Sequence, residues 1–269
     1  MTAVVELTGL DARSARAISG DVHDVALADG SHVVAKDSGS ALAEAASLRW
    51  LAVPGGPPVP RVLGRGGTWL VTDLVPTGRP TAEAAEAFGR ELAVLHGTGA
   101  PAFGSPPPGG PVDAAIGLAP MRNETGERWP EWYWAHRVEP YLRTATDQGL
   151  LTRREAGLIT ARVERAEDPG EPPARLHGDL WSGNVLWAAD GRAWLIDPAA
   201  HGGHRETDLA MLRLFGCPHL DRVLDAYQQV APLADGWADR VGLHQLFPLL
   251  VHVVLFGGGY ASQAVAAAR

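Results

Sequence analysis

The stretch His177-Gly178-Asp179-Leu180-Trp181-Ser182-Gly183-Asn184 is followed, after a short interval, by Trp194-Leu195-Ile196-Asp197. An aspartate thus stands two residues after a histidine, an asparagine stands five residues after that aspartate, and a second aspartate lies further along. Carboxylate and amide oxygens are the ligands that suit a hard cation such as Mg²⁺. The pattern therefore indicates a site built from oxygen donors.

This spacing is that of a kinase catalytic loop with a metal-binding aspartate downstream. Phosphoryl transfer needs one carboxylate that orients the attacking hydroxyl group and accepts its proton, and it needs separate oxygen ligands for Mg²⁺ on the triphosphate. The sequence predicts Asp179 in the first role. Asn184 and Asp197 are predicted to be the Mg²⁺ ligands, with ATP as the phosphoryl donor.

A hairpin is expected between these residues. Residues 185–187 and 193–196 read as two short strands, and Asp190-Gly191 is a strong signal for a two-residue turn. A turn centred on that dipeptide would place Asn184 directly opposite Asp197, at the distance of about 4.5–5.5 Å that separates cross-strand partners. The alternative is a polar pair at the open end of an ordinary surface hairpin.

The composition singles out Lys36. The chain has 22 Arg but one Lys, so its only lysine is expected where a guanidinium cannot serve. It ends a short apolar strand, His32-Val33-Val34-Ala35-Lys36, similar to the strand whose lysine binds the α- and β-phosphates of ATP. Glu44 is the expected partner, on a helix that begins at Ser40. The predicted buried face of that helix is Ala41, Leu42, Ala45, Leu48 and Leu51. The alternative is a solvated lysine.

Length and charge limit the function classes. A chain of 269 residues with 46% hydrophobic and 20% charged residues is typical of a globular protein of one large or two modest domains. A formal charge of −8 argues against sequence-independent binding of nucleic acid, which depends on a cationic surface. The single cysteine, Cys217, excludes an intramolecular disulfide and a multi-cysteine metal site. We expect a cytoplasmic monomer that acts on a small molecule.

No membrane partner is expected. Residues 1–6 lack the basic region and apolar core of a signal peptide. Residues 241–268 contain no Asp, Glu, Lys or Arg, but their dense apolar part is only residues 246–256 and includes Pro248. That length is too short to span a bilayer, so a buried helix is predicted.

Two lobes are predicted, at residues 1–78 and 79–269. The first combines a hairpin of residues 22–27 and 31–36, the helix with Glu44, and a strand at 69–72, with turns at 55–58 and 64–67. Residues 73–78 read as a hinge. Helical periods then dominate, starting with a helix capped by Thr81 and closed at Gly97. The fold class is therefore α+β and bilobal, with a small antiparallel sheet and one helix in the N-terminal lobe and a larger, mainly helical C-terminal lobe.

Two segments of the second lobe have a local interpretation. Residues 101–111 are rich in Pro and Gly and are predicted to be a loop. Aromatic residues then gather between positions 129 and 141, and packing of a helix is favoured over stacking on a sugar or an aromatic amine. These aromatic residues are Trp129, Trp132, Tyr133, Trp134 and Tyr141.

These motifs together resemble the fructosamine kinase (ketosamine 3-kinase) family, which is related to the aminoglycoside phosphotransferases and shares a protein-kinase-like fold. The resemblance is carried by residues 177–184, by Ile196-Asp197-Pro198-Ala199, and by the stretch from Gly203 to Gly216, which reads Gly-His-Arg-Glu-Thr-Asp-Leu-Ala-Met-Leu-Arg-Leu-Phe-Gly. Weaker matches extend over most of the chain. They include Lys36, Glu44, residues 59–60, 89–96, 103–104 and 116–117, Arg137, residues 245–257 and Tyr260.

The resemblance implies roles for single residues. Asp179 would be the catalytic base, Asn184 and Asp197 would bind Mg²⁺, and Lys36 paired with Glu44 would hold the ATP phosphates. Trp181 follows the base, and it either forms a wall of the sugar site or packs as a core aromatic beneath the loop. His177 is expected to support the loop. Arg205, Glu206 and Asp208 are expected to brace the loop and the helix.

The sequence departs from the family pattern at three places. The loop that should cover the phosphates, residues 18–23, has one glycine where two are usual, and Ser19 and Gly20 are its predicted nucleotide contacts. Asp73 and Val75 are the predicted contacts in the hinge. His201-Gly202 replaces a common pair of tyrosines, and residues 117–123 follow the pattern loosely. Both departures lie where the substrate is expected to be selected, and His201 is therefore a candidate substrate contact.

The leading hypothesis is an ATP-dependent kinase that phosphorylates the 3-hydroxyl of a ketosamine, such as a fructosamine or ribulosamine, in the deglycation of metabolites or glycated proteins. One alternative is a phosphotransferase for an aminoglycoside or another amino alcohol. Another is a catalytically silent, pseudokinase-like nucleotide-binding protein, which the single glycine of the phosphate loop suggests.

Overall fold

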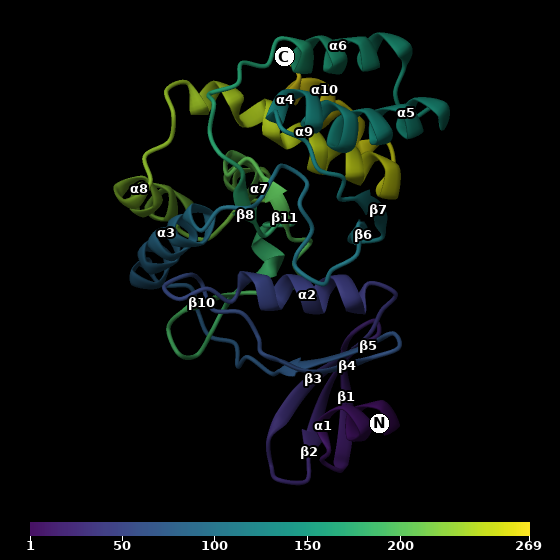
Figure 1. Cartoon of the computed structure of the whole chain (residues 1–269), viewed down its shortest axis with the longest axis vertical. Coiled ribbons are helices and arrows are strands. Elements are labelled where there is room, and N and C mark those ends of the chain that lie inside the picture. The colour runs from purple at the N-terminus through teal and green to yellow at the C-terminus, as the bar shows by residue number, and fades with distance from the viewer.

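The computed structural model describes residues 1–269. Its N-terminal part contains an antiparallel sheet of five strands in the order β1-β2-β3-β5-β4 (Figure 1). Val33 and Ala35 alternate along the third strand with less buried neighbours and pack on Val25 and Leu27, as expected of a sheet with one covered face. The strands are β1 (Ala12–Ser19), β2 (Val22–Leu27), β3 (His32–Asp37), β4 (Val62–Gly66) and β5 (Trp69–Asp73).

The predicted hairpin of β2 and β3 is confirmed, as is the strand β5. The predicted turn at residues 64–67 is confirmed only at Gly67, which has a φ of 56° and begins the turn from β4 to β5, because Gly64 and Gly66 belong to β4. A short helix, α1 (Thr2–Thr8), was not predicted, and it packs on that strand. A β-carbon at Gly64 would lie 2.7 Å from the Leu7 backbone oxygen. Gly64 and Gly66 therefore permit the close approach of α1.

The helix α2 (Ala41–Leu51) lies between the sheet and the helical part of the molecule (Figure 1). Ala41, Ala45, Leu48 and Leu51 are buried, as the pattern predicted, whereas Leu42 is 42% exposed. Glu44 is buried as well. Successive helical residues are rotated by about 100°, so Leu42 lies beside the buried stripe and not within it. Glu44, on the buried stripe, is thereby directed toward the sheet.

The remainder of the chain is mainly helical (Figure 1). Thr81 caps its first helix by accepting a hydrogen bond from the Ala84 N–H at 3.1 Å, and the loop at 101–111 contains no helix or strand, as predicted. A division at residue 78 stays a prediction. The helices are α3 (Ala82–Gly97), α4 (Trp129–Tyr133), the π-helical turn η1 (Trp134–Val138), α5 (Glu139–Asp147), α6 (Arg153–Glu164), α7 (Glu206–Phe215), α8 (Leu220–Val230), α9 (Trp237–Phe256) and α10 (Gly259–Ala267).

Short strands form three further pairs, which carry the loops of the site. The pairs are β6 (Asp113–Ile116) with β7 (Ala119–Arg122), β8 (Ala174–Leu176) with β11 (His201–Gly203), and β9 (Val185–Trp187) with β10 (Ala193–Leu195). A single 3₁₀ turn, η2 (Ser182–Asn184), precedes β9. The β9–β10 hairpin also contacts the predicted hinge, since the Gly78 N–H donates to the Trp187 carbonyl at 2.7 Å and the Ala189 N–H to that of Pro76 at 2.8 Å.

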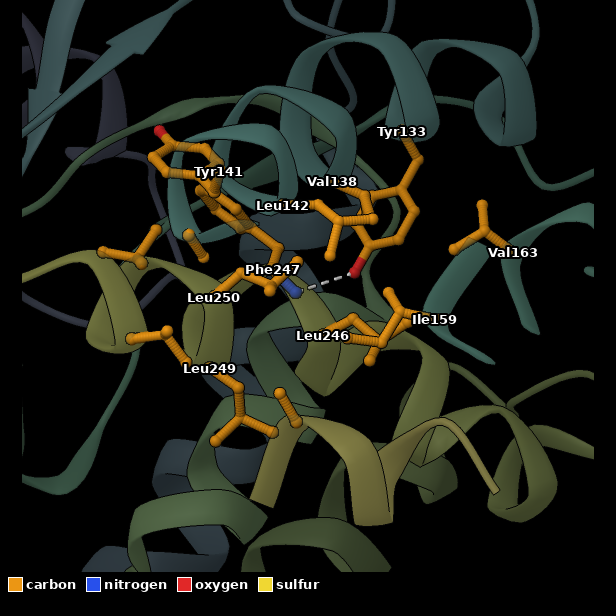
Figure 2. Packing of buried hydrophobic residues seen from close by; sticks show 14 of the residues in the cluster. Tyr133, Val138, Tyr141, Leu142, Ile159, Val163, Leu246, Phe247, Leu249 and Leu250 are labelled. Carbon is orange, nitrogen blue, oxygen red and sulfur yellow. Dashed lines mark hydrogen bonds between the residues drawn. The ribbon is translucent and has the colours of Figure 1, made fainter. Parts of the chain in front are cut away.

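The aromatic segment packs the helical core, as predicted. Trp129, Trp132, Tyr133 and Tyr141 are buried, and Tyr133 reaches the break that Pro248 makes in α9. Pro248 has no N–H to bond the His244 carbonyl four residues earlier, and that carbonyl lies 3.4 Å from the Tyr133 hydroxyl. The Tyr133 hydroxyl donates to the Leu243 carbonyl at 2.8 Å and accepts from the Phe247 N–H at 3.2 Å (Figure 2). The apolar segment 246–256 is thus part of a largely buried helix, as predicted. None of the helices combines the length and the apolar composition that a membrane span needs.

Candidate active site

Two cavities meet between the sheet and the helical part. A polar cavity of about 240 Å³ lies under α2 and the β6–β7 hairpin, and an apolar cavity of about 310 Å³ lies between the sheet and the β9–β10 hairpin. Lys36, Glu44 and Asp197 line both of them. A group that moves from a molecule in one cavity to a molecule in the other would pass these three side chains.

Lys36 forms the boundary between the cavities. Its Nζ atom lies 2.8 Å from Glu44 Oε2 and 2.9 Å from Asp197 Oδ1. Burial alone would lower the pKa of Lys36, but the two carboxylates outweigh burial and raise it. The predicted pair with Glu44 is confirmed, and the solvated alternative is wrong. The side chain is therefore a charged ammonium group in a partly desolvated position, as expected of a phosphate ligand.

The loop that carries Asp179 is held in place by Asp208 at the start of α7. One carboxylate oxygen of Asp208 accepts the His177 N–H at 2.8 Å, and the other accepts the Gly178 N–H at 3.0 Å. Gly178 has a φ of 83°, and a β-carbon there would lie 2.1 Å from the Ala199 carbonyl oxygen. The loop therefore needs glycine at this position for both conformation and space. Asp208 is a brace, as expected.

His177 supports the loop from below, as predicted. Its ring is fully buried and its Nε2 lies 3.0 Å from the Ile196 carbonyl oxygen. The Asp179 N–H donates to Nδ1 at 3.3 Å. Both nitrogens are thus occupied, and burial lowers the pKa of His177. A neutral ring in this position holds the loop and is not available to the reacting hydroxyl.

Asp179 opens into the polar cavity beside Asn184. The Asn184 Nδ2 group donates to the Asp179 carbonyl at 2.8 Å and to its Oδ2 at 3.0 Å. Burial raises the pKa of Asp179 to about 6, so the carboxylate is ionised at neutral pH yet more basic than a solvated aspartate. Because Nδ2 serves Asp179, the Oδ1 atom of Asn184 is the one available to a cation.

The predicted register of the β9–β10 hairpin is wrong by one residue. Leu195 pairs with Val185, and the Ile196 N–H donates to the Asn184 carbonyl at 3.1 Å, so Asn184 faces Ile196 and not Asp197. The turn has three residues instead of two, since the Ala188 N–H donates to the Arg192 carbonyl at 2.9 Å. Gly191, at φ 80°, supplies the left-handed residue that such a loop requires.

Asp197 nevertheless returns to the site. It follows the end of β10 with a φ of 51°, which is rare for a residue other than glycine. Its half-exposed side chain lines both cavities, and Asn184 lines the polar one. A carboxylate and an amide oxygen are a donor set that suits Mg²⁺. The residues present therefore fit the predicted cation.

The apolar cavity has the features of a nucleobase site. Val22, Val34 and Leu70 of the sheet lie on one side, with Leu186 and Ile196 of the β9–β10 region on the other. Neither Leu74 nor Val75 uses its backbone N–H or carbonyl in a hydrogen bond within the protein. Of the predicted nucleotide contacts, Ser19, Asp73 and Val75 line this cavity, whereas Gly20 does not. Gly20 forms the turn between β1 and β2 with a φ of 48°.

The two candidate substrate contacts differ in position. The Trp181 ring is 40% exposed, lines the polar cavity and contacts Phe215 edge to face, so it is not a core aromatic. His201 is 2% exposed and lies in β11, with Nδ1 at 3.0 Å from the Ala199 carbonyl oxygen. It does not line the polar cavity, because Ala199 and Ala200 lie there instead. A direct substrate contact by His201 is therefore not supported.

Part of the polar cavity was not predicted from the sequence. Asn123 lines it together with Ser40 and Ser47 of α2 and with five residues of the segment before it, Pro107, Pro111, Ala114, Ala115 and Gly117. Asn123 is one of only two asparagines in the chain, and the other is Asn184. The rarity that drew attention to Lys36 applied equally to Asn123. Its place in a loosely matching segment hid it.

Replacing Asp208 by asparagine is expected to lower the free energy of unfolding by about 3 kcal/mol or more, because an amide group would face N–H donors in a fully buried place. Burial alone would raise the pKa of Asp208, but hydrogen bonds, first that from His96, lower it. The contribution of ionised Asp208 to the free energy of unfolding is therefore present above about pH 4, and it is lost as the pH falls through the lowered pKa of the folded state.

Urea unfolding of wild type and Asp208→Asn at several pH values measures this difference. The difference in free energy of unfolding between wild type and the variant should be largest near pH 7 and should become smaller below pH 4. Asp221→Asn is the matched control, because Asp221 lies in the first turn of α8 and is exposed. A variant as stable as this control would contradict the role of Asp208 as a brace.

Comparisons with known proteins identify the family and the relatives of this chain. The family model described as fructosamine kinase matches residues 34–268. A crystal structure from Thermobifida fusca, provisionally named a fructosamine-3-kinase, is 48% identical with a TM-score of 0.92, and the match covers 100% of this chain and 96% of that one. More distant solved structures, such as a macrolide 2′-phosphotransferase at 18% identity and a TM-score of 0.64, share the fold alone.

Two curated relatives are similar in sequence. A provisionally named ketoamine kinase of Enterococcus faecium is 39% identical over 176 residues, which are 64% of this chain and 61% of that protein. The chloroplastic protein-ribulosamine 3-kinase of Arabidopsis thaliana is 32% identical over 206 residues, which are 76% of this chain and 61% of that protein. The match thus spans about three fifths of each of these relatives. The predicted bilobal, protein-kinase-like α+β fold is confirmed, and the chain belongs to the fructosamine kinase family.

Proposed function

We propose that this protein transfers the γ-phosphoryl group of ATP to the 3-hydroxyl of a small ketosamine. The observation that carries the proposal is the meeting of the two cavities at Lys36, Glu44 and Asp197, with Asp179 on the polar side. The nucleotide would occupy the apolar cavity with its phosphates at Lys36. The sugar-amine would occupy the polar cavity with one hydroxyl at Asp179.

Each residue of the site would have its own role in the reaction. Asp179 accepts the proton of the attacking hydroxyl, for which a buried carboxylate with a pKa of about 6 is suited. Lys36 holds the phosphate oxygens, and Glu44 fixes the position of Lys36. Asn184 and Asp197 would hold Mg²⁺, which neutralises charge on the phosphates when it is bound. Trp181 would form an apolar wall against the sugar.

The names of the relatives support the choice of acceptor. One relative is named a protein-ribulosamine 3-kinase and another is provisionally named a ketoamine kinase. The family model that matches this chain is that of fructosamine kinase. The phosphorylated adduct is less stable than the ketosamine, so the reaction would serve deglycation. Glycated proteins as larger acceptors and a monomeric state stay predictions.

The test is incubation of the protein with Mg²⁺, ATP and a panel of acceptors. Fructosyl and ribulosyl amines of several sizes are compared with aminoglycosides and other amino alcohols. ADP release measures turnover, and ³¹P NMR of the phosphorylated acceptor shows which carbon carries the phosphate. Phosphate at the third carbon of a ketosamine supports the proposal. Turnover of antibiotics alone would establish the aminoglycoside alternative, and no turnover of any acceptor would favour a silent nucleotide-binding protein.

A further inference from the structure

Asn123 lines the polar cavity and not the apolar one, which the nucleotide would occupy. It follows β7 directly and is 2% exposed. The chain contains two asparagines, and both line this one cavity. Asn184 serves Asp179, as described above. A role for Asn123 follows from how its amide group is oriented.

Arg137 fixes the orientation of that amide. Its Nη2 donates to Asn123 Oδ1 at 2.7 Å. A guanidinium group carries only donors, so the amide atom that faces it must be the oxygen. The Nδ2 group of Asn123 therefore points away from Arg137, and a flipped amide would place two donors against each other.

Arg137 is itself held firmly. It is 1% exposed, and its Nη1 donates to the carbonyls of Arg122 at 2.9 Å and His136 at 3.1 Å. Its guanidinium carbon lies 4.6 Å from the centre of the Trp132 ring. A buried and stacked guanidinium cannot turn to follow a ligand. Arg137 is thus a positioning residue, and it presents Asn123 in one orientation.

The Nδ2 group of Asn123 has no partner within the protein. Among the residues that line the polar cavity, Asn123 is the only one with a buried side-chain nitrogen or oxygen that makes no hydrogen bond. Buried donors without an acceptor are unfavourable, and they are rare in folded proteins. A ligand in this cavity can supply the missing acceptor.

We infer that Asn123 Nδ2 donates a hydrogen bond to the oxygen of the acceptor that neighbours the phosphorylated hydroxyl. The inference rests on the proposed function. Asp179 can only accept, so it selects a hydroxyl. Asn123 Nδ2 can only donate, so it selects an oxygen with a free lone pair. An open-chain ketosamine has both groups on adjacent carbons, because its C2 carbonyl oxygen can only accept and stands next to the 3-hydroxyl. Asn123 is thereby a specificity-determining residue for the oxygen at C2.

The variant Asn123→Asp tests this directly. Aspartate keeps the size of the side chain and still accepts from Arg137, but it replaces the free donor by an acceptor. The catalytic efficiency for fructosamine should fall at least about tenfold, through KM for the acceptor, with KM for ATP unchanged. A merely structural role would change both constants or neither. Thermal unfolding of the variant shows that it is folded.

The matched control is a change in the substrate. An acceptor analogue without the C2 oxygen removes the other half of the same hydrogen bond. Wild type should lose at least about tenfold in efficiency with this analogue, and Asn123→Asp should lose nothing more, because the two changes remove one interaction. Additive losses would show that Asn123 does not contact this oxygen and would overturn the inference.

The low asparagine content permits a second readout that does not depend on turnover. Selective ¹⁵N labelling of asparagine gives two side-chain amide pairs, from Asn123 and Asn184, and Asn123→Asp assigns them by loss of one. Saturating fructosamine should shift the Asn123 pair, and Mg²⁺ with a non-hydrolysable ATP analogue should shift that of Asn184. If wild type phosphorylates fructosamine while the Asn123 pair does not move, the inference fails and the proposed function stands. If no ketosamine is phosphorylated, the proposed function fails and the inference fails with it.

Discussion

Asp179→Asn is expected to lower kcat for the phosphorylated acceptor by about 10³-fold, within the range of about 10²–10⁴ that a positioned general base contributes. The carboxylate is the group in the polar cavity that is placed to accept a proton from a hydroxyl, while His177 has both ring nitrogens engaged. An asparagine retains an oxygen that can accept from the Asn184 Nδ2 group, which now lies 3.0 Å away. The loop geometry should therefore survive the change.

The measurement separates chemistry from binding. Steady-state kinetics give kcat, and isothermal titration with Mg²⁺ and ATP gives the nucleotide affinity, which should change little. Asp147→Asn is the matched control, because Asp147 is an exposed aspartate at the end of α5. If kcat of Asp179→Asn lies within about threefold of that of this control, Asp179 is not the general base, because such a change is far below the range that a general base contributes.

The parts of the site that were predictable are those whose spacing in the sequence fixes a local structure. Lys36 and Glu44 were found because an apolar strand and an amphipathic helix follow one another closely, and the pair is formed. Asp179 and Asn184 lie within one turn of the chain, so their contact follows from sequence spacing. The glycines of β4 were misread because their reason is tertiary, namely the approach of α1.

The errors in the site have the same origin. The Asp190-Gly191 dipeptide predicts a turn correctly, but it does not decide between a two-residue and a three-residue loop, and that choice shifts the register by one. The burial of His201 depends on its pairing with Leu176, in a strand 25 positions away in the chain. The orientation of the Asn123 amide group is set by Arg137, whose position follows from the packing of η1. Such contacts are made by the folded chain and leave no local pattern.

The only lysine provides the second large effect. Lys36→Met is expected to reduce the catalytic efficiency for ATP by about 10²–10³-fold, the loss seen when one preorganised electrostatic contact is removed. The ammonium joins Glu44 to Asp197 at 2.8 and 2.9 Å, at the boundary of the two cavities. Without it, Glu44 stays buried beside Asp197 with no cation, and the triphosphate meets two carboxylates. Both effects oppose nucleotide binding.

Lys36→Arg decides whether charge alone is sufficient. In a chain with 22 arginines the background clearly tolerates guanidinium groups, yet this position holds an ammonium. A guanidinium group presents its donors in a rigid planar fork and does not reproduce the compact ammonium that contacts both carboxylates at 2.8 and 2.9 Å. We therefore expect Lys36→Arg to restore little of the activity lost in Lys36→Met, as measured by kcat/KM for ATP. Arg90→Met, at an exposed position of α3, is the control and should remain fully active. Full activity of Lys36→Arg would mean that the site requires positive charge and not the shape of lysine, and the rarity of lysine would then need another explanation.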